Sequence, residues 1–107
     1  MSRLDNEHPR STVYRHGALQ LDDERKTAFK GDRPLLLRPR EFALLKILMK
    51  EPNRPFARTK LSEVLSGGGA KLRDNAVDLL VRRLRKKLGP ETILTLLGRG
   101  YKLSGAQ

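Results

Sequence analysis

Residues 77–88 decide the fold, and they read Val-Asp-Leu-Leu-Val-Arg-Arg-Leu-Arg-Lys-Lys-Leu. Apolar residues recur here at steps of four, three and four, which places them in one stripe on a helix that advances about 100° per residue. The stripe consists of Val77, Val81, Leu84 and Leu88. The opposite face carries Asn75, Leu79, Arg82, Arg83 and Lys86, and it is flanked by Arg85 and Lys87. The segment therefore predicts a helix with one face in a core and a strongly basic face outside it.

The basic face has two interpretations. It can be a solvated surface, or it can enter a DNA major groove, which is about 12 Å wide, admits a helix and is bordered by phosphates. Lys and Arg total 23 against 12 acidic residues, a net charge of +11. Residues 54–107 hold 12 basic and 4 acidic residues, whereas residues 1–53 hold 11 and 8. Because the excess lies around the basic helix, an anionic polymer is the favoured partner.

Other function classes find little support. The 107 residues suffice for one small domain and not for two. No apolar run approaches the roughly 20 residues of a membrane span, so no membrane partner is predicted. The absence of cysteine excludes disulfides and thiolate metal sites and is compatible with a cytoplasmic location.

No catalytic or metal site can be assembled from the sequence. The two histidines, His8 and His16, have no partner at a metal-binding spacing, so we predict no metal and no cofactor. The glycine-rich residues 67–71 do not form a P-loop, because Leu72 stands where the motif needs Ser or Thr and a helix is predicted to precede the loop in place of a strand. Because no nucleophile, base and orienting group can be combined from the sequence, we predict that the chain is not an enzyme.

Short strands and helices are predicted around the basic helix. Alternating apolar and turn residues predict an antiparallel sheet with strands at 13–15, 19–21, 27–29 and 35–37. Pro39 at a first helical position predicts a helix to about Lys50. Its buried residues are expected to be Phe42, Leu44, Leu45, Leu48 and Met49.

A second, shorter helix is predicted over residues 59–65, with Leu61, Val64 and Leu65 inward. The basic helix follows, with Asp74 or Asn75 as N-cap, and Gly89-Pro90 ends it. Residues 93–96 and 101–103 flank Gly98-Arg99-Gly100 and predict a β-hairpin with positive φ at the glycines.

These elements define an α+β fold. It is a winged helix-turn-helix with an N-terminal four-stranded antiparallel sheet, three helices and a C-terminal β-hairpin wing. We expect the domain to span residues 13–104, between a C-terminal tail at 105–107 and a polar segment at 1–12. That polar segment is either a disordered tail or the remainder of an interdomain linker.

Three blocks of this sequence resemble a known family. They are residues 37–45 (Leu-Arg-Pro-Arg-Glu-Phe-Ala-Leu-Leu), residues 75–88, and residues 93–95 with 98–103 (Gly-Arg-Gly-Tyr-Lys-Leu). In this order and spacing they resemble the C-terminal effector domain of OmpR/PhoB-type response regulators. The resemblance implies a transcription factor of a two-component system whose third helix lies in the major groove. It also implies a dimer on direct-repeat DNA, a phosphorylated receiver domain preceding this one, and contact with RNA polymerase through the loop at 66–72.

Some positions depart from the family pattern. Arg38 stands where Thr is frequent and Ala57 where Ser or Thr is frequent, so both helix N-caps are expected to be weak. Leu97 replaces a basic or aromatic residue before the first hairpin glycine. Arg99 can supply the missing charge to an A·T-rich minor groove, or it can meet a phosphate. A wing that does not touch DNA is the competing hypothesis.

The DNA-contacting residues are predicted as follows. Arg82, Arg83 and Lys86 face the groove, while Arg73, Arg85 and Lys87 reach phosphates. Asn75 and Leu79 meet base edges, although Leu79 has the alternative of packing against the second helix or the loop. The predicted function is sequence-specific double-stranded DNA binding at promoters. The alternatives are sequence-independent nucleic-acid binding, and a winged-helix protein-interaction module.

Overall fold

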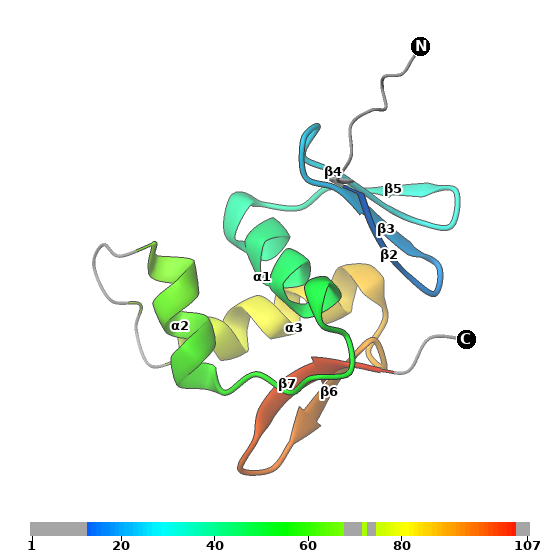
Figure 1. Cartoon of the computed structure of the whole chain (residues 1–107). Coiled ribbons are helices and arrows are strands. Elements are labelled where there is room, and N and C mark those ends of the chain that lie inside the picture. Colours follow the sequence, from blue (N-terminus) through cyan, green and yellow to red (C-terminus); the bar gives the residue numbers. More distant parts are fainter. Residues whose placement is uncertain (1–12, 68–71, 73–74, 105–107) are drawn as a thin grey trace.

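Helix α1 (Pro39–Lys50) is the central element of the molecule. The structure is a computed structural model that describes residues 13–67, 72 and 75–104. A four-stranded antiparallel sheet lies on one side of it and the remaining helices on the other (Figure 1). The sheet contains β2 (Val13–His16), β3 (Leu19–Asp22), β4 (Thr27–Lys30) and β5 (Arg33–Leu35), in that order. Helices α2 (Arg58–Ser66) and α3 (Ala76–Leu88) follow, and a hairpin of β6 (Ile93–Leu96) and β7 (Gly100–Leu103) ends the described chain. The predicted winged helix-turn-helix is confirmed.

The core forms around α1 because its apolar residues cover much of its circumference. The five predicted core residues of α1 are all buried. They pack in one cluster with residues of the sheet, of α2 and α3, and of the hairpin, among them Leu21, Leu61, Leu84 and Leu103. One contiguous core therefore joins every element of the domain.

The fourth strand begins earlier in the chain than predicted. Lys30 pairs with Arg33, so Gly31 and Asp32 alone form the turn, and Gly31 has the positive φ of 61° that such a tight turn requires. Pro34 is tolerated because β5 is an edge strand. The chain then leaves the sheet, and the side chain of Leu36 is 88% exposed. The prediction of a strand at 35–37 was therefore wrong by two residues.

Helix α2 buries a narrower stripe than predicted. Leu61 and Leu65 are buried, but Val64 is 47% exposed, so its predicted inward position was wrong. Val64 is displaced by about 100° from Leu65 around the helix axis. A helix of 9 residues that packs along one stripe leaves that direction in solvent.

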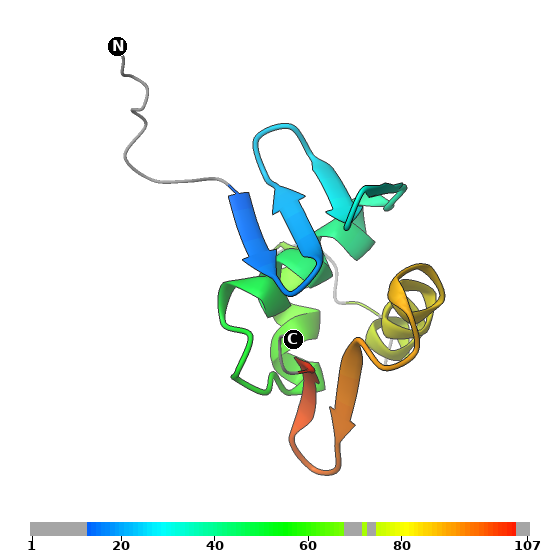
Figure 2. The same ribbon diagram turned by 90° about the vertical axis from the view of Figure 1, so that its right-hand side faces the viewer.

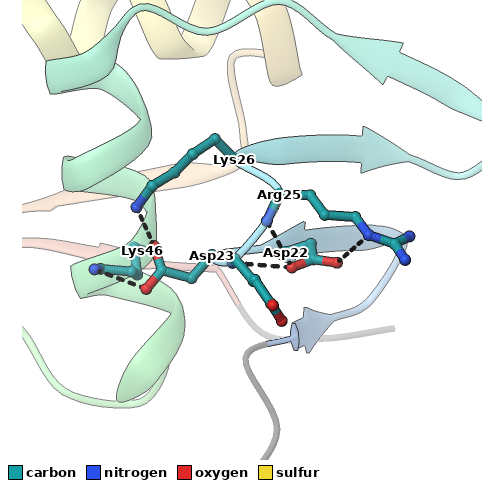
Figure 3. Close-up of polar contacts among 6 residues, drawn as sticks. Asp22, Asp23, Arg25, Lys26 and Lys46 are labelled. Atoms are coloured by element: carbon teal, nitrogen blue, oxygen red, sulfur yellow. Dashed lines mark hydrogen bonds and ion pairs between the residues drawn. The ribbon is translucent and has the colours of Figure 1, made fainter.

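A charged turn ties the sheet to α1 (Figure 3). The Asp23 carboxylate accepts hydrogen bonds from Lys26 at 2.7 Å and from Lys46 of α1 at 3.3 Å. The hydrogen bond from Lys26 is the main reason that the pKa of Asp23 is below its ordinary value. Asp22 accepts the backbone N–H groups of Glu24 and Arg25, which closes the turn. The sheet is thereby fixed to the middle of α1.

The wing is fixed to the start of α2 by backbone pairing. Phe56 and Tyr101 exchange backbone hydrogen bonds of 2.8 and 3.0 Å. At Gly100, with φ of 103°, a Cβ atom would lie 1.9 Å from the carbonyl oxygen of Phe56. Gly98, with φ of 72°, has open space around the same position. Both glycines have the predicted positive φ, and only Gly100 is also required by a close backbone approach.

We expect Gly100→Ala to destabilise the domain by more than about 3 kcal/mol, since backbone strain is joined by a clash that backbone atoms must move to relieve. Gly98→Ala is the matched control and should cost about 1–2 kcal/mol, from the positive φ alone. Urea unfolding followed by circular dichroism measures both. Equal destabilisation by the two substitutions would contradict the close approach at Gly100.

Candidate nucleic-acid interface

Helix α3 divides into a buried and an exposed face as its periodicity predicts. Val77, Val81, Leu84 and Leu88 are buried, and Leu80 joins them. The opposite face is exposed along its length, at Asn75, Leu79, Arg82, Arg83 and Lys86. The predicted amphipathic helix is confirmed.

Three cations of the exposed face make no intramolecular polar contact with the described residues. The side chains of Arg82, Arg83 and Lys86 form no hydrogen bond or ion pair with another residue that the structure describes. They are therefore available to an external anion.

Arg85 and Lys87, predicted to reach phosphates, have intramolecular partners. The Arg85 guanidinium donates to the carbonyl oxygen of Ile93 at 3.0 and 2.6 Å and to the Thr95 hydroxyl at 2.8 Å. The Lys87 ammonium donates to the Glu41 carboxylate at 2.6 Å and to the carbonyl oxygen of Leu36 at 2.7 Å. Both side chains therefore position α3 against its neighbours, a role that the sequence pattern does not reveal.

Glu41 is the buried partner of this arrangement, with an exposed fraction of 1%. Burial raises the pKa of Glu41, but the hydrogen bonds from Lys87 and from the backbone N–H of Arg38 outweigh it, and the net pKa is lowered. The N–H of Arg38 donates to Glu41 at 3.0 Å, which is one half of a capping box. Because a guanidinium has no acceptor, the other half is missing. The weak N-caps predicted at Arg38 and Ala57 are confirmed, since neither side chain forms a cap hydrogen bond.

Two cations of the sheet cap the C-terminal end of α3. Lys30 of β4 donates to the carbonyl oxygen of Leu88, and Arg33 of β5 donates to that of Lys87 at 3.0 Å. These carbonyls have no partner within the helix and carry the negative end of its dipole. The sheet therefore holds α3 by its C-terminus.

The first turn of α3 is attached to the wing and to α2. The Tyr101 hydroxyl donates to the Asp78 carboxylate, and Arg58 lies 3.4 Å from the same carboxylate. Burial and the hydrogen bond to Asp78 raise the pKa of Tyr101, so its hydroxyl keeps its proton and remains a donor. Helix α3 is consequently held at both ends.

The wing projects beside α3 with its tip in solvent. Leu97 is 94% exposed, and Arg99 is also exposed. A cleft of about 800 Å³ separates the tip from α2 and α3. The Arg99 side chain forms no hydrogen bond or ion pair with another described residue.

The remaining predicted residues lie near the start of α3. Asn75 occupies the N-cap position without a side-chain cap hydrogen bond. Leu79 is 39% exposed and lines a groove against the start of α1, an arrangement that neither hypothesis for it had included. Arg73, Asp74 and most of the 66–72 loop lie outside the described residues.

Two negative findings concern the described part of the chain. None of its helices is long and apolar enough to cross a membrane. Its His, Asp and Glu side chains form no group of three or more that could hold a metal ion.

A helix-turn-helix of α2 and α3, with a basic outer face on α3 and a wing after it, defines a winged-helix domain of the DNA-binding class. Residues 32–103 match the family described as transcriptional regulatory protein, C terminal, and the chain belongs to this family. It is the family of OmpR/PhoB-type effector domains, as the resemblance implied.

Relatives of known name support this assignment. The chain is 40% identical to the transcriptional regulatory protein QseB of Escherichia coli O157:H7, over 87% of this chain and 42% of that protein. It is 38% identical to the phosphate regulon transcriptional regulatory protein PhoB of Rhizobium meliloti, over 87% of this chain and 43% of that protein. The chain thus spans less than half the length of these relatives.

Solved structures agree with the sequence comparison. The DNA-binding domain of CpxR from E. coli superposes with a TM-score of 0.79 at 32% identity, covering 91% of this chain and 100% of that one. The Klebsiella pneumoniae RstA DNA-binding domain, in complex with the RstA box, gives 0.76 at 26% identity and covers 86% and 96%.

We expect Lys87→Met to destabilise the domain by about 1–3 kcal/mol at neutral pH, because it removes a donor from a buried carboxylate. A lowered pKa stabilises the fold above the unfolded pKa, which for Glu is ordinarily 4.5. That contribution is lost as pH falls through the still lower folded pKa. The deficit of the variant should therefore shrink below about pH 4.5.

The exposed neighbour provides the control, since Lys86→Met removes the same charge and no buried contact. Urea unfolding of both variants between pH 3 and pH 7 is the measurement. A loss of the same size in both, or one that does not change with pH, would show that Glu41 does not depend on Lys87.

Proposed function

We propose that this chain is the DNA-reading part of a two-component response regulator, binding double-stranded promoter DNA sequence-specifically through α3 and its wing. The observation that carries the proposal is the division of cations on α3. Arg82, Arg83 and Lys86 are exposed without a described partner, whereas Arg85 and Lys87 hold the helix in place. A helix fixed at both ends with a basic outer face suits insertion into a major groove.

The proposed contacts divide into base and phosphate contacts. Asn75 and Leu79 are proposed to meet base edges, the first through its amide and the second through a thymine methyl. Arg82, Arg83 and Lys86 supply the positive charge within the groove. Arg73 is proposed to reach a phosphate. Arg85 and Lys87 are proposed to reach phosphates only through those N–H donors that their internal hydrogen bonds do not use.

The assembly around this domain is also a proposal. We propose a dimer on direct-repeat DNA, control by a phosphorylated receiver domain, contact with RNA polymerase through the 66–72 loop, and no enzymatic activity. The family assignment and the length of the relatives support it, because QseB and PhoB are regulatory proteins more than twice as long as the matched segment.

Selection of sites from random duplex, followed by a salt series, tests the proposed function. If α3 and the wing neutralise about 5 phosphates, the slope of log affinity against log salt should be near −4.5. Affinity should then fall by about several hundred-fold between 50 and 200 mM salt. A selected site should also bind at least about 1000-fold more tightly than its shuffled version.

Other outcomes identify the alternatives. A steep slope with equal affinity for selected and shuffled duplex would indicate a sequence-independent nucleic-acid binder. A slope shallower than about −2 would exclude DNA as the principal partner and leave a protein-interaction module.

The wing provides a second prediction. Arg99 is the charged residue at its exposed tip, and a narrow A·T-rich minor groove attracts arginine. We expect Arg99→Ala to weaken binding mainly where the site has an A·T-rich flank, with little change in thermal stability. Two duplexes that differ only in an A·T- or G·C-rich flank are compared. The same loss on both would assign Arg99 to a phosphate, and no loss on either would remove the wing from the interface.

A further inference from the structure

A second group of exposed cations lies beside α3, at the start of α1. Arg38 precedes α1 and Arg40 is in its first turn, and both are exposed. With Arg83 of α3 they line a groove of about 380 Å³. The other lining residues are uncharged: Pro39, Ala76, Leu79 and Leu80. The groove therefore combines three guanidinium groups with an apolar surface.

No described acidic side chain lines this groove. The side chains of Arg38, Arg40 and Arg83 form no hydrogen bond or ion pair with another described residue. The carboxylate of the first turn of α1, on Glu41, is 1% exposed and bonded to Lys87. The positive end of the α1 dipole adds to the field. The charged residues among the described lining of the groove are thus all arginines.

The groove lies on the side of α3 opposite the wing. Figure 2 shows α3 nearly along its axis, with the start of α1 above it and the β6–β7 hairpin below it. A major groove is bordered on both edges by a sugar–phosphate backbone. If α3 occupies the groove, the wing approaches one edge and the start of α1 approaches the other.

We infer that the start of α1 binds the DNA backbone on the edge of the major groove away from the wing. Arg38, Arg40 and Arg83 hold a phosphate, since planar guanidinium groups match its oxygens. Pro39 packs against the adjoining deoxyribose, and Leu79 remains the contact to the base edge. This inference rests on the proposed function and extends its interface from α3 and the wing to α1.

The chemistry of the groove fits this occupant better than a free anion. A phosphodiester backbone alternates charged phosphates with largely apolar sugars, and the groove presents both kinds of surface. Because backbone contacts carry no direct sequence information, the α1 arginines should contribute affinity and orientation rather than base preference.

The test uses Arg38→Gln, Arg40→Gln and their double variant, with Lys50→Gln as control. Lys50 is exposed at the opposite end of α1, so its substitution removes one charge without touching the groove. Each groove substitution should flatten the log–log salt slope by about 0.9 and weaken binding on the order of tenfold at 0.1 M salt. The loss should be equal on selected and shuffled duplex, whereas Lys50→Gln should change affinity by less than about twofold.

Charge-preserving variants and the wild type separate the outcomes. Arg38→Lys and Arg40→Lys should keep most of the salt slope, because the positive charge remains. If the two arginines had only a structural role, the slope would not follow their charge. Urea unfolding of every variant identifies losses that come from folding. This inference alone would be overturned if the wild type binds selectively with a steep salt slope while the double variant has the same affinity and slope as Lys50→Gln. A wild-type slope shallower than about −2 would overturn the proposed function and this inference with it.

Discussion

The ion pair between Glu41 and Lys87 fixes how α3 lies on the rest of the domain. A carboxylate that is 1% exposed remains charged only if hydrogen bonds replace its lost hydration, and its described donors are Lys87 and the backbone N–H of Arg38. The pair therefore joins α3 to α1 at one defined rotation. Arg83 lies four residues before Lys87 and so on the same side of α3, which places it against the start of α1. The shape of the basic surface depends on this buried contact.

The basic residues in the described part of the chain include two groups with different physical roles. One group acts inside the domain, where Lys30 and Arg33 cap α3, Arg85 binds the wing and Lys46 binds the charged turn. The other group lies on α3, at the wing tip and at the start of α1, and its side chains are exposed and form no hydrogen bond or ion pair with another described residue. Only the second group can exchange counterions for phosphates without first breaking an internal bond. The number of phosphate contacts is consequently smaller than the number of basic residues.

The sequence predicts the fold well because its main signals are periodic and local. The spacing of Val77, Val81, Leu84 and Leu88 requires a helix with one buried face, and glycine marks the hairpin where φ must be positive. Its errors arise where tertiary contacts choose between local alternatives. The two-residue turn at 31–32 moves β5 to Arg33–Leu35, and a single packing stripe leaves Val64 in solvent.

The candidate site is only partly predictable for the same reason. Periodicity separates the two faces of α3, but it cannot distinguish Arg82 from Arg85 by their partners, since those partners come from distant segments. Arg85 meets a carbonyl of β6, and Lys87 meets a carboxylate 46 residues earlier in the chain. Likewise, Arg38 is visible in the sequence only as a poor N-cap, because its neighbour Arg83 belongs to another helix.

The same arrangement links stability to binding. Five cations between Arg82 and Lys87 repel one another, and Lys30 and Arg33 add positive charge at the end of the same helix. Carbonyl groups, the carboxylate of Glu41 and the helix dipole offset this repulsion for the cations that point inward. Arg82, Arg83 and Lys86 form no ion pair with a described residue, so an anionic partner relieves repulsion that the folded domain otherwise retains. Because such a partner binds the folded arrangement and not the unfolded chain, it also stabilises the placement of α3 that creates its own binding surface.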